Sequence, residues 1–357
     1  MTDNTQLPFL SVIAPLYNGR DDLPDLLACL AAQTYPSDRL EFLLVDNNSQ
    51  DNTFEILQTA VPQFKSQGFT LIPLQELDIQ SSYAARNCGI FQAKGEIFAF
   101  LDGDCRPAPH WLENLVQPFL TGSAPSAASS DKTLDSNEIG MVAGEIQALP
   151  GNSRLERYAN RQDILSQKHT LANSFFPYGQ TANLAVRRIV FEKIGLFRSY
   201  LTTGGDADIC WRMQQHTPYK IVLASDAVVR HRHRATLADF RGQFRRYGKS
   251  NAYLNKLHGI PLMTPWTASD YVRRPLRWLL REIPIAIAKR FLGRASWGDL
   301  DLEMLGMPLE LLGMRSRYAG QQSAQIPKRG HEIPPFPSPS PQDLSLTQPQ
   351  DEGVEMG

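Results

Sequence analysis

One stretch of the sequence restricts the fold more than any other. It is the apolar run Ile97–Leu101, which ends abruptly at Asp102-Gly103-Asp104. Five apolar residues before a sharp polar break predict a strand buried on both faces of a sheet. The carboxyl ends of such strands open into the crevice where open α/β sheets bind ligands. Because residues i and i+2 of a strand point to the same face, we expect Asp102 and Asp104 to converge on one point.

Two converging carboxylates repel each other unless a cation lies between them or one is protonated. A hard divalent cation with oxygen ligands would resolve this repulsion. Gly103 would allow a ligand or a tight turn to approach closely. The alternative is an ordinary surface turn, because Asp-Gly is a common turn dipeptide. A metal site is therefore a hypothesis that the rest of the chain must support.

Apolar runs and helical apolar spacings alternate through the first third of the chain. Strands are expected at 10–14, 41–45, 70–73 and 97–101, and helices at 22–33, 51–59 and 83–93. This alternation predicts parallel βαβ units with right-handed crossovers, and so an α/β fold. Asp51 is the predicted N-cap of the second helix.

The later part of the chain divides by composition. Residues 121–139 form a Ser/Ala-rich insertion, and strands are expected again at 141–147 and 220–224, with a helix near 190–195 and an acidic stretch at 205–208. The Leu- and Arg-rich part predicts helices, and the Pro/Ser/Gln-rich end predicts disorder. The expected units are 1–120, 121–139, 140–255, 256–320 and 321–357.

Charge and cysteine content exclude several classes of function. The formal net charge of the 357 residues is −1, which argues against a nucleic-acid partner. The four cysteines are scattered without a Cys-x-x-Cys pair, so reduced thiols are expected rather than disulfides or a zinc site. No secretory signal and no run of 18 apolar residues is found, so we expect a cytoplasmic location.

Six short motifs follow one another at characteristic distances: Ser11–Asn18, Leu44–Thr53, Ala85–Ile90, Phe100–Asp104, Gly204–Arg212 and Gln243–Tyr247. Each is weak alone, but their order resembles that of the family 2 glycosyltransferases over residues 8–255. The resemblance implies the GT-A fold, a Rossmann-like, mostly parallel sheet flanked by helices, here with a C-terminal helical extension. It also implies inverting transfer of a sugar, of the hexosyl type, from a nucleotide-sugar, with a UDP-sugar as the favoured donor.

The resemblance assigns the donor nucleotide to the first motifs. Asp46 would bind the base, and its alternative role is to cap the next helix. In the loop after the first strand, the implied contacts come from Pro15, Tyr17 and Asn18. Arg86 and Asn87 would contact the nucleotide or its phosphates, because a guanidinium suits a diphosphate. The alternative for Arg86 is an exposed helical arginine.

The resemblance makes Asp102-Gly103-Asp104 the Asp-x-Asp motif of the family. Asp104 would bind Mn²⁺ or Mg²⁺ directly, whereas Asp102 would contact the ribose or a metal-bound water. His231 would complete the metal shell, or it would join His233 in a basic patch that binds phosphate. The metal would act as a Lewis acid on the leaving nucleoside diphosphate.

Asp206 is the candidate general base, because inverting displacement needs a carboxylate to take the acceptor proton. The family usually has Glu where this chain has Gly205. Asp208 would orient the loop through Arg212, four residues on. The alternative is that both acids begin an exposed helix. A catalytically silent sugar-nucleotide-binding subunit is the other class of function that this departure leaves open.

Acceptor binding is assigned to Glu145 and to Gln243, Arg246 and Tyr247, which resemble the family's Gln-x-x-Arg-Trp motif with Tyr for Trp. The expected acceptor is a saccharide or lipid-linked molecule used in polysaccharide, cell-wall or glycolipid assembly. Residues 271–294 mix apolar and basic side chains, so they predict either peripheral contact with the inner membrane face or an ordinary helix packed on the catalytic domain.

Overall fold

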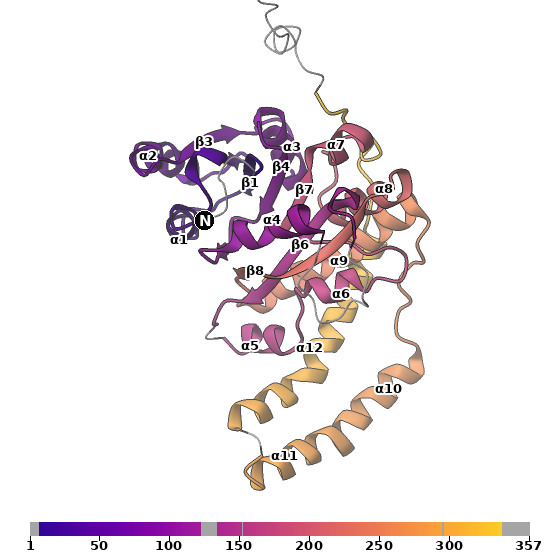
Figure 1. Ribbon diagram of the computed structural model, residues 1–357. Coiled ribbons are helices and arrows are strands. Elements are labelled where there is room, and N and C mark those ends of the chain that lie inside the picture. Colours follow the sequence, from indigo (N-terminus) through magenta and orange to yellow (C-terminus); the bar gives the residue numbers. More distant parts are fainter. Residues whose placement is uncertain (1–6, 123–133, 152, 295, 338–357) are drawn as a thin grey trace, which may run out of the picture.

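The computed structural model describes residues 7–122, 134–151, 153–294 and 296–337 (Figure 1). Within these residues the strands form one eight-stranded sheet, in the order β3-β2-β1-β4-β7-β6-β8-β5. The strands are β1 (Leu10–Leu16), β2 (Leu40–Asp46), β3 (Thr70–Gln75), β4 (Ile97–Leu101), β5 (Cys105–Pro107), β6 (Ile139–Ala148), β7 (Asn183–Arg187) and β8 (Lys220–His231).

Helices cover both faces of this sheet. They are α1 (Leu23–Ala31), α2 (Thr53–Ser66), α3 (Ser82–Gln92), α4 (Trp111–Thr121), α5 (Arg154–Arg161), α6 (Gln167–Leu171), α7 (Arg188–Ile194), α8 (Gly205–His216), α9 (Leu237–His258), α10 (Ala268–Arg277), α11 (Ile283–Phe291) and α12 (Trp297–Gln322). Two 3₁₀ turns (Ser37–Arg39 and Ser136–Glu138) and one π-helical turn (Trp278–Glu282) complete the described elements.

The strands of the first half are apolar on both faces, which explains their continuous apolar runs. In β1, Val12 and Ala14 pack under α1, α2 and α4, while Ile13 packs on the opposite face under α3. Strands β3, β2, β1 and β4 are all parallel. The α/β fold and the parallel first half predicted from the alternation are therefore confirmed.

The second half of the sheet is mixed and its strands are longer than expected. β7 runs antiparallel to both β4 and β6, whereas β6 and β8 are parallel. The expected strand at 220–224 continues to His231, with a register shift opposite Gly144 and Glu145. His231 is thus the last residue of β8, rather than part of a loop after it.

The start of the second helix also differs from expectation. α2 begins at Thr53 with Asn52 as its N-cap, and Asn52 makes no side-chain capping bond. Asp51 lies one residue earlier, and its carboxylate accepts a hydrogen bond from the Thr53 amide at 3.0 Å. A short Asp side chain reaches the amide two residues on, so it satisfies a helix donor from outside the cap position.

The C-terminal helices pack closely against the catalytic domain through α9 and α12. A Cβ on Gly248 would lie 1.8 Å from the Arg317 carbonyl oxygen, and one on Gly320 would lie 2.0 Å from that of Arg245. Glycine therefore allows the two helix backbones to touch. α9 runs on to His258, so the boundary expected after residue 255 falls inside a helix.

Residues 268–291 form an arm that projects away from the sheet (Figure 1). α10 contains Pro275, α11 has Pro284 in its first turn, and the π-helical turn joins them. The helix continues through both prolines, with right-handed helical backbone at Arg277 and Glu282, and the π-helical turn between them is its one irregularity among the described residues. No helix in the described part of the chain is both long and apolar enough to span a membrane.

The C-terminal segment corrects the expected disorder of residues 321–357. Residues 321–337 are ordered: the Leu196 amide donates to the Pro334 carbonyl at 2.8 Å, and the Phe336 ring stacks on Phe98 with centroids 6.5 Å apart. Ile326 and Phe336 pack on the sheet's second core, so a few apolar residues in a proline-rich run are enough to hold it. Residues 338–357, and 123–133 of the expected insertion, lie outside the described residues.

Candidate active site

A cavity of about 640 Å³ lies where the parallel strands end. It is lined from both halves of the sheet and by α9. Twelve of the residues expected in the site line it: Pro15, Tyr17, Asn18, Arg86, Asp102, Gly103, Asp104, Asp206, His231, Gln243, Arg246 and Tyr247. Four expected residues do not: Asp46, Asn87, Glu145 and Asp208.

The loop after β1 is held by the loop after β2. Asn18 has a positive φ of 48°, its amide donates to the Ser49 hydroxyl at 2.9 Å, and its side-chain oxygen accepts from the Gln50 amide at 2.8 Å. Asn tolerates this left-handed backbone better than most residues. The loop thereby presents Tyr17, more than half exposed, at the edge of the cavity.

Asp46 is buried at the end of β2 and does not line the cavity. Its carboxylate accepts from the Ser49 amide at 3.3 Å and from Gln75 at 3.4 Å. The next residue, Asn47, reaches the cavity instead. Asp46 thus holds the turn that begins with Asn47. The sequence motif pointed to Asp46 as the residue at the cavity, whereas the residue that lines the cavity is its neighbour, Asn47.

Asn87 is a correction to the expected donor contacts. Its side chain is buried, donates to the Phe197 carbonyl at 2.8 Å and to the Ser199 hydroxyl at 2.9 Å, and accepts from the Phe197 amide at 3.1 Å. Since α3 turns by 100° per residue, neighbouring residues face different ways. Arg86 faces the cavity, whereas Asn87 anchors the 197–199 loop.

Arg86 is a buried arginine, which excludes an exposed position on the helix. Its Nη2 lies 2.5 Å from Oδ1 of Asp102, and its guanidinium carbon lies 5.5 Å from the centre of the Tyr83 ring. Its Nε is buried without a hydrogen-bond partner among the described residues. A buried guanidinium with an unused donor beside a polar cavity is suited to an anionic ligand.

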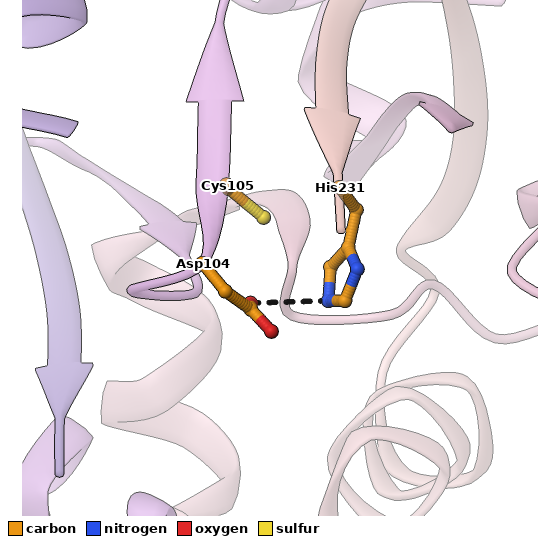
Figure 2. A group of neighbouring side chains, drawn as sticks. All are labelled: Asp104, Cys105 and His231. Carbon is orange, nitrogen blue, oxygen red and sulfur yellow. Dashed lines mark ion pairs between the residues drawn. The ribbon is translucent and has the colours of Figure 1, made fainter. Parts of the chain in front are cut away.

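Asp104 pairs with His231, as Figure 2 shows. The Asp104 carboxylate lies 3.1 Å from Nε2 of His231 and 3.7 Å from the Arg234 guanidinium. Asp102 pairs with Arg86 instead, so the two carboxylates have different partners in the cavity that both line. β4 ends at Leu101, so residues 102–104 form a turn and the strand rule for i and i+2 no longer applies.

The charges around Asp104 and His231 shift the pKa values of both side chains. Burial would raise the pKa of Asp104, but His231 and Arg234 outweigh it and lower that pKa to about 2. Burial would lower the pKa of His231, but the Asp104 carboxylate raises it above its ordinary value. Nδ1 of His231 lies 2.8 Å from the Arg232 carbonyl, which can only accept, so Nδ1 carries a proton.

These two side chains have the chemistry of a metal site. A carboxylate suits Mg²⁺ and Mn²⁺, and a neutral imidazole whose Nδ1 is held by a carbonyl offers Nε2 to a metal. Cys105 lies in the same cluster, with its ligand atom within 4.8 Å of the others (Figure 2). Its buried thiol donates to the Ala182 carbonyl and burial raises its pKa well above the ordinary value, so it is a poor ligand.

Asp206 stands in the first turn of α8, half-buried in the cavity wall. Its Oδ1 accepts from the Thr181 hydroxyl at 2.9 Å. Burial raises the pKa of Asp206, Asp102 adds to the rise, and Arg86 opposes it. A Cβ on Gly205 would lie 2.7 Å from the Tyr83 ring, so the Glu that the family usually has at this position would clash with that ring.

Asp208 lies away from the cavity, fully buried among three basic groups. Its carboxylate lies 2.9 Å from the nearest nitrogen of each of Arg198, Arg212 and His258. The expected contact with Arg212 is present, and the burial excludes an exposed acidic helix start. Burial would raise the pKa of Asp208, but these partners lower it to about 2.

The α9 motif faces the cavity as a unit, with Gln243 donating to the Tyr247 hydroxyl at 3.1 Å.

Glu145 does not reach this cavity. It lines a separate one of about 310 Å³ near α5 and lies 3.7 Å from Lys168. Sequence reasoning missed Tyr83, Thr181 and Arg234, whose types carry no motif and whose roles depend on what packs beside them.

Comparisons with known proteins agree with this geometry. The family model "Glycosyl transferase family 2" matches residues 11–184. Glycosyltransferase AglE of Haloferax volcanii is 33% identical over 285 residues, covering 78% of this chain and 86% of that protein. The undecaprenyl-phosphate 4-deoxy-4-formamido-L-arabinose transferase of Pseudomonas savastanoi is 34% identical over 111 residues, 31% of this chain and 32% of that protein.

The fold is also that of a solved glycosyltransferase. The mannosyltransferase PcManGT from Pyrobaculum calidifontis, in complex with GDP-Man and Mn²⁺, superposes with a TM-score of 0.54 and 20% identity, covering 90% of this chain and 87% of that one. The resemblance inferred from the motifs is therefore confirmed. The chain belongs to the family 2 glycosyltransferases and is a glycosyltransferase of the GT-A fold.

Proposed function

We propose that the protein transfers a sugar, with inversion, from a nucleotide-sugar to a hydroxyl of a saccharide or lipid-linked acceptor. A UDP-sugar is the favoured donor. One observation carries the proposal: a single cavity gathers the Arg86–Asp102 pair, the Asp104–His231 pair and the half-buried Asp206 carboxylate. These groups supply an anion-binding cation, a metal-binding pair and a proton acceptor.

Asp104 and His231 would hold Mn²⁺ or Mg²⁺. When bound, the metal would supply Lewis-acid stabilisation of the leaving diphosphate. Arg86 and Arg246, which both line the cavity, would bind the phosphate oxygens, and Asp102 would keep Arg86 in place. Pro15, Tyr17 and Asn18 would contact the nucleoside, with Asp46 shaping the turn that carries Asn47.

Asp206 would act as the general base. The acceptor oxygen forms a bond to the anomeric carbon while the bond to the nucleoside diphosphate breaks, and the hydroxyl proton passes to the Asp206 carboxylate. A raised pKa suits this role, because a base works best when its pKa lies near the working pH. Thr181 holds the carboxylate in position through its 2.9 Å bond.

The first test uses thermal unfolding of the purified protein with UDP, GDP, CDP and ADP, each with and without Mn²⁺. A ligand that binds only the native state at a hundredfold excess over Kd stabilises it by about 2.7 kcal/mol. A metal-dependent shift for one nucleotide, lost in Asp104→Asn, supports the donor site and names the donor class. No shift for any nucleotide, with or without metal, contradicts it.

We also propose that the arm formed by residues 268–291 contacts the inner face of a membrane, where lipid-linked acceptors for polysaccharide or cell-wall assembly would be met. The arm exposes Leu279, Leu280 and Phe291, with Phe291 83% exposed. Residues 271–294 carry seven basic side chains and one acidic one. Exposed apolar residues among basic ones suit an anionic bilayer surface.

Vesicle sedimentation tests this contact. The protein should bind vesicles that contain phosphatidylglycerol and release them in high salt, and it should bind phosphatidylcholine vesicles weakly. Phe291→Asp should reduce binding, whereas Leu237→Asp, at an exposed position outside the arm, should not. Equal binding of both variants would contradict a role for the arm.

A further inference from the structure

A second cavity, of about 460 Å³, meets the first at Asp206. Asp206 and Tyr247 line both cavities. An acceptor hydroxyl can therefore reach the Asp206 carboxylate from this second cavity while the donor fills the first. The second cavity is the place where the proposed function requires the acceptor to bind.

The walls of the second cavity are mostly uncharged. Trp211, Leu254 and Met263 give it an apolar side, and it reaches α12 at Arg317. Among the described residues, the acidic and basic side chains that line it are Asp206, His169 and Arg317. The cavity therefore combines an apolar wall with one permanent cation.

Arg317 has no acidic partner in the described part of the chain. Its guanidinium carbon lies 4.7 Å from the Phe244 ring centre and 5.6 Å from that of Tyr247, so two aromatic rings hold it in place. Its Nε is buried with no hydrogen-bond partner among the described residues. Burial lowers the pKa of Arg317, and no carboxylate offsets that effect.

A second polar group of the same cavity is also unpartnered. Ser166 is only 2% exposed, it lines the cavity, and its hydroxyl makes no hydrogen bond among the described residues. Buried polar atoms in native proteins are almost always paired, so an unpaired one calls for an explanation. Arg317 and Ser166 thus place two side chains with spare hydrogen-bonding capacity in the wall of one cavity, which points to a polar ligand.

We propose that this second cavity binds the acceptor, and that the acceptor carries a phosphate or carboxylate group that Arg317 recognises. The inference rests on the proposed function, because it assumes that Asp206 takes the acceptor proton. A planar guanidinium binds an oxyanion through two parallel hydrogen bonds. The anionic group takes no part in bond making: it fixes the acceptor while a hydroxyl of the same molecule attacks the donor.

The apolar wall gives the remainder of the acceptor a surface to lie on. Its partly exposed apolar residues include Ile260 and Met263, and the buried Trp211 indole, fixed by its bond to the Phe176 carbonyl at 2.8 Å, supports this wall from behind. A sugar ring or the first carbons of a lipid chain could pack there, with the anionic group at Arg317. A neutral acceptor of the same shape would leave the Arg317 guanidinium without a counter-charge, so the site selects for charge.

Calorimetric titration tests the proposal with glucose 6-phosphate, glucose and inorganic phosphate as probes. Glucose 6-phosphate should bind the wild-type protein more tightly than either of the others. Arg317→Gln should weaken that binding roughly tenfold to hundredfold, as expected for a lost charge-assisted contact. Arg317→Lys should recover part of it, and Arg315→Gln, an exposed change two residues away on α12, should have no effect.

A matched variant in the first cavity identifies the binding place. Arg246 lines only the first cavity, so Arg246→Gln should leave glucose 6-phosphate binding intact. Loss in Arg246→Gln but not in Arg317→Gln would overturn the proposal, as would equal affinity for glucose 6-phosphate and inorganic phosphate, or no binding. Thermal unfolding shows whether Arg317→Gln is folded. If it is not, the glucose 6-phosphate affinity of Arg317→Lys tests the proposal in its place.

Titration of the same proteins with UDP and Mn²⁺ separates this proposal from the proposed function. If UDP stabilises both wild type and Arg317→Gln while glucose 6-phosphate fails to bind, the acceptor inference is wrong and the donor site stands. If UDP and the other nucleotides also fail, the donor site itself is wrong.

Discussion

The two sides of the active-site cavity are built in different ways. On the proposed donor side, most of the residues lie within a few positions of a strand end, as Asn18 does after β1 and Asp104 after β4, although Arg86 belongs to α3 and Arg246 to α9. On the acceptor side, Asp206 comes from the start of α8, Tyr247 from α9 and Arg317 from α12. The first side is positioned by sheet hydrogen bonds, and the second by helix packing.

This difference affects how each side can vary. A parallel sheet fixes its strand ends by a regular ladder, so loop residues can change without moving the site. Helices α8, α9 and α12 hold their residues through buried ion pairs and glycine contacts, such as the Asp208 cluster and Gly248 against α12. Changes there should move the acceptor side as a whole, and the following predictions test this comparison.

The largest effect is expected from Asp206→Asn. An amide cannot take the acceptor proton, so the rate of sugar transfer should fall by about 10²–10⁴-fold. Nucleotide binding with Mn²⁺ should be retained, because Asp206 contributes to the acceptor side. Initial rates and UDP titrations measure the two properties separately. Unchanged transfer would remove Asp206 from the mechanism, and loss of UDP binding would show that the two sides are not separate.

Asp208→Asn should disturb the acceptor side through its packing. Removing the charge leaves Arg198 and Arg212 buried without a carboxylate, so the free energy of unfolding should fall by about 3–5 kcal/mol. Denaturant unfolding measures it, with the exposed Asp226→Asn as control. A loss below about 1 kcal/mol would mean that the cluster adds little beyond a surface ion pair.

The same carboxylate predicts an acid dependence. The pKa of Asp208 is lowered from 3.8 to about 2, so the folded state holds its proton less tightly than the unfolded state does. Its contribution to stability is complete above the ordinary pKa and is lost as the pH falls from there towards 2. Wild type and Asp208→Asn should therefore differ in stability at neutral pH and approach each other in strong acid.

On the proposed donor side, Asp104→Asn and His231→Gln should each weaken metal-dependent nucleotide binding by about tenfold or more, because each removes a ligand of the proposed metal site. Cys105→Ala is the matched control from the same cluster (Figure 2). It should keep metal-dependent binding, since the buried thiol stays protonated. Titration with UDP and Mn²⁺ gives the affinities. A loss in Cys105→Ala equal to that in Asp104→Asn would assign the thiol as a ligand.

The comparison also explains what the sequence could predict. The alternating apolar runs predicted the parallel half of the sheet, because a strand covered on both faces must be apolar throughout. Asp104 was placed near a cavity by its position after a buried strand and by the resemblance, and Arg86 by the resemblance alone; both line the cavity. Asn87 does not reach the cavity because one step along α3 from Arg86 turns its side chain towards Phe197. Asp46 does not reach it because the turn after β2 presents the next residue, Asn47.

The acceptor side resisted prediction for a physical reason. Arg317 lies 111 positions after Asp206, and nothing in its local sequence distinguishes it from the exposed Arg315 on the same helix. Its place in the second cavity depends on the glycine-mediated contact of α9 with α12, which no motif records. Glu145 was misplaced because only the packing of β6 near α5 decides which cavity it faces.

The smallest effect should come from Phe336→Ala. Phe336 belongs to the C-terminal segment, yet it stacks on Phe98 of the donor half and lies 5.5 Å from the Arg188 guanidinium. Because this ring is only partly buried, its loss should lower the free energy of unfolding by about 1–2 kcal/mol, less than a fully buried Phe. Leu280→Ala, at a 71% exposed position of the arm, should change stability little.

Amide exchange in β4 and α7 should increase in Phe336→Ala while transfer stays near the wild-type rate. If exchange increases in α9 and α12 instead, the segment stabilises the acceptor side, and the division of the molecule must be redrawn.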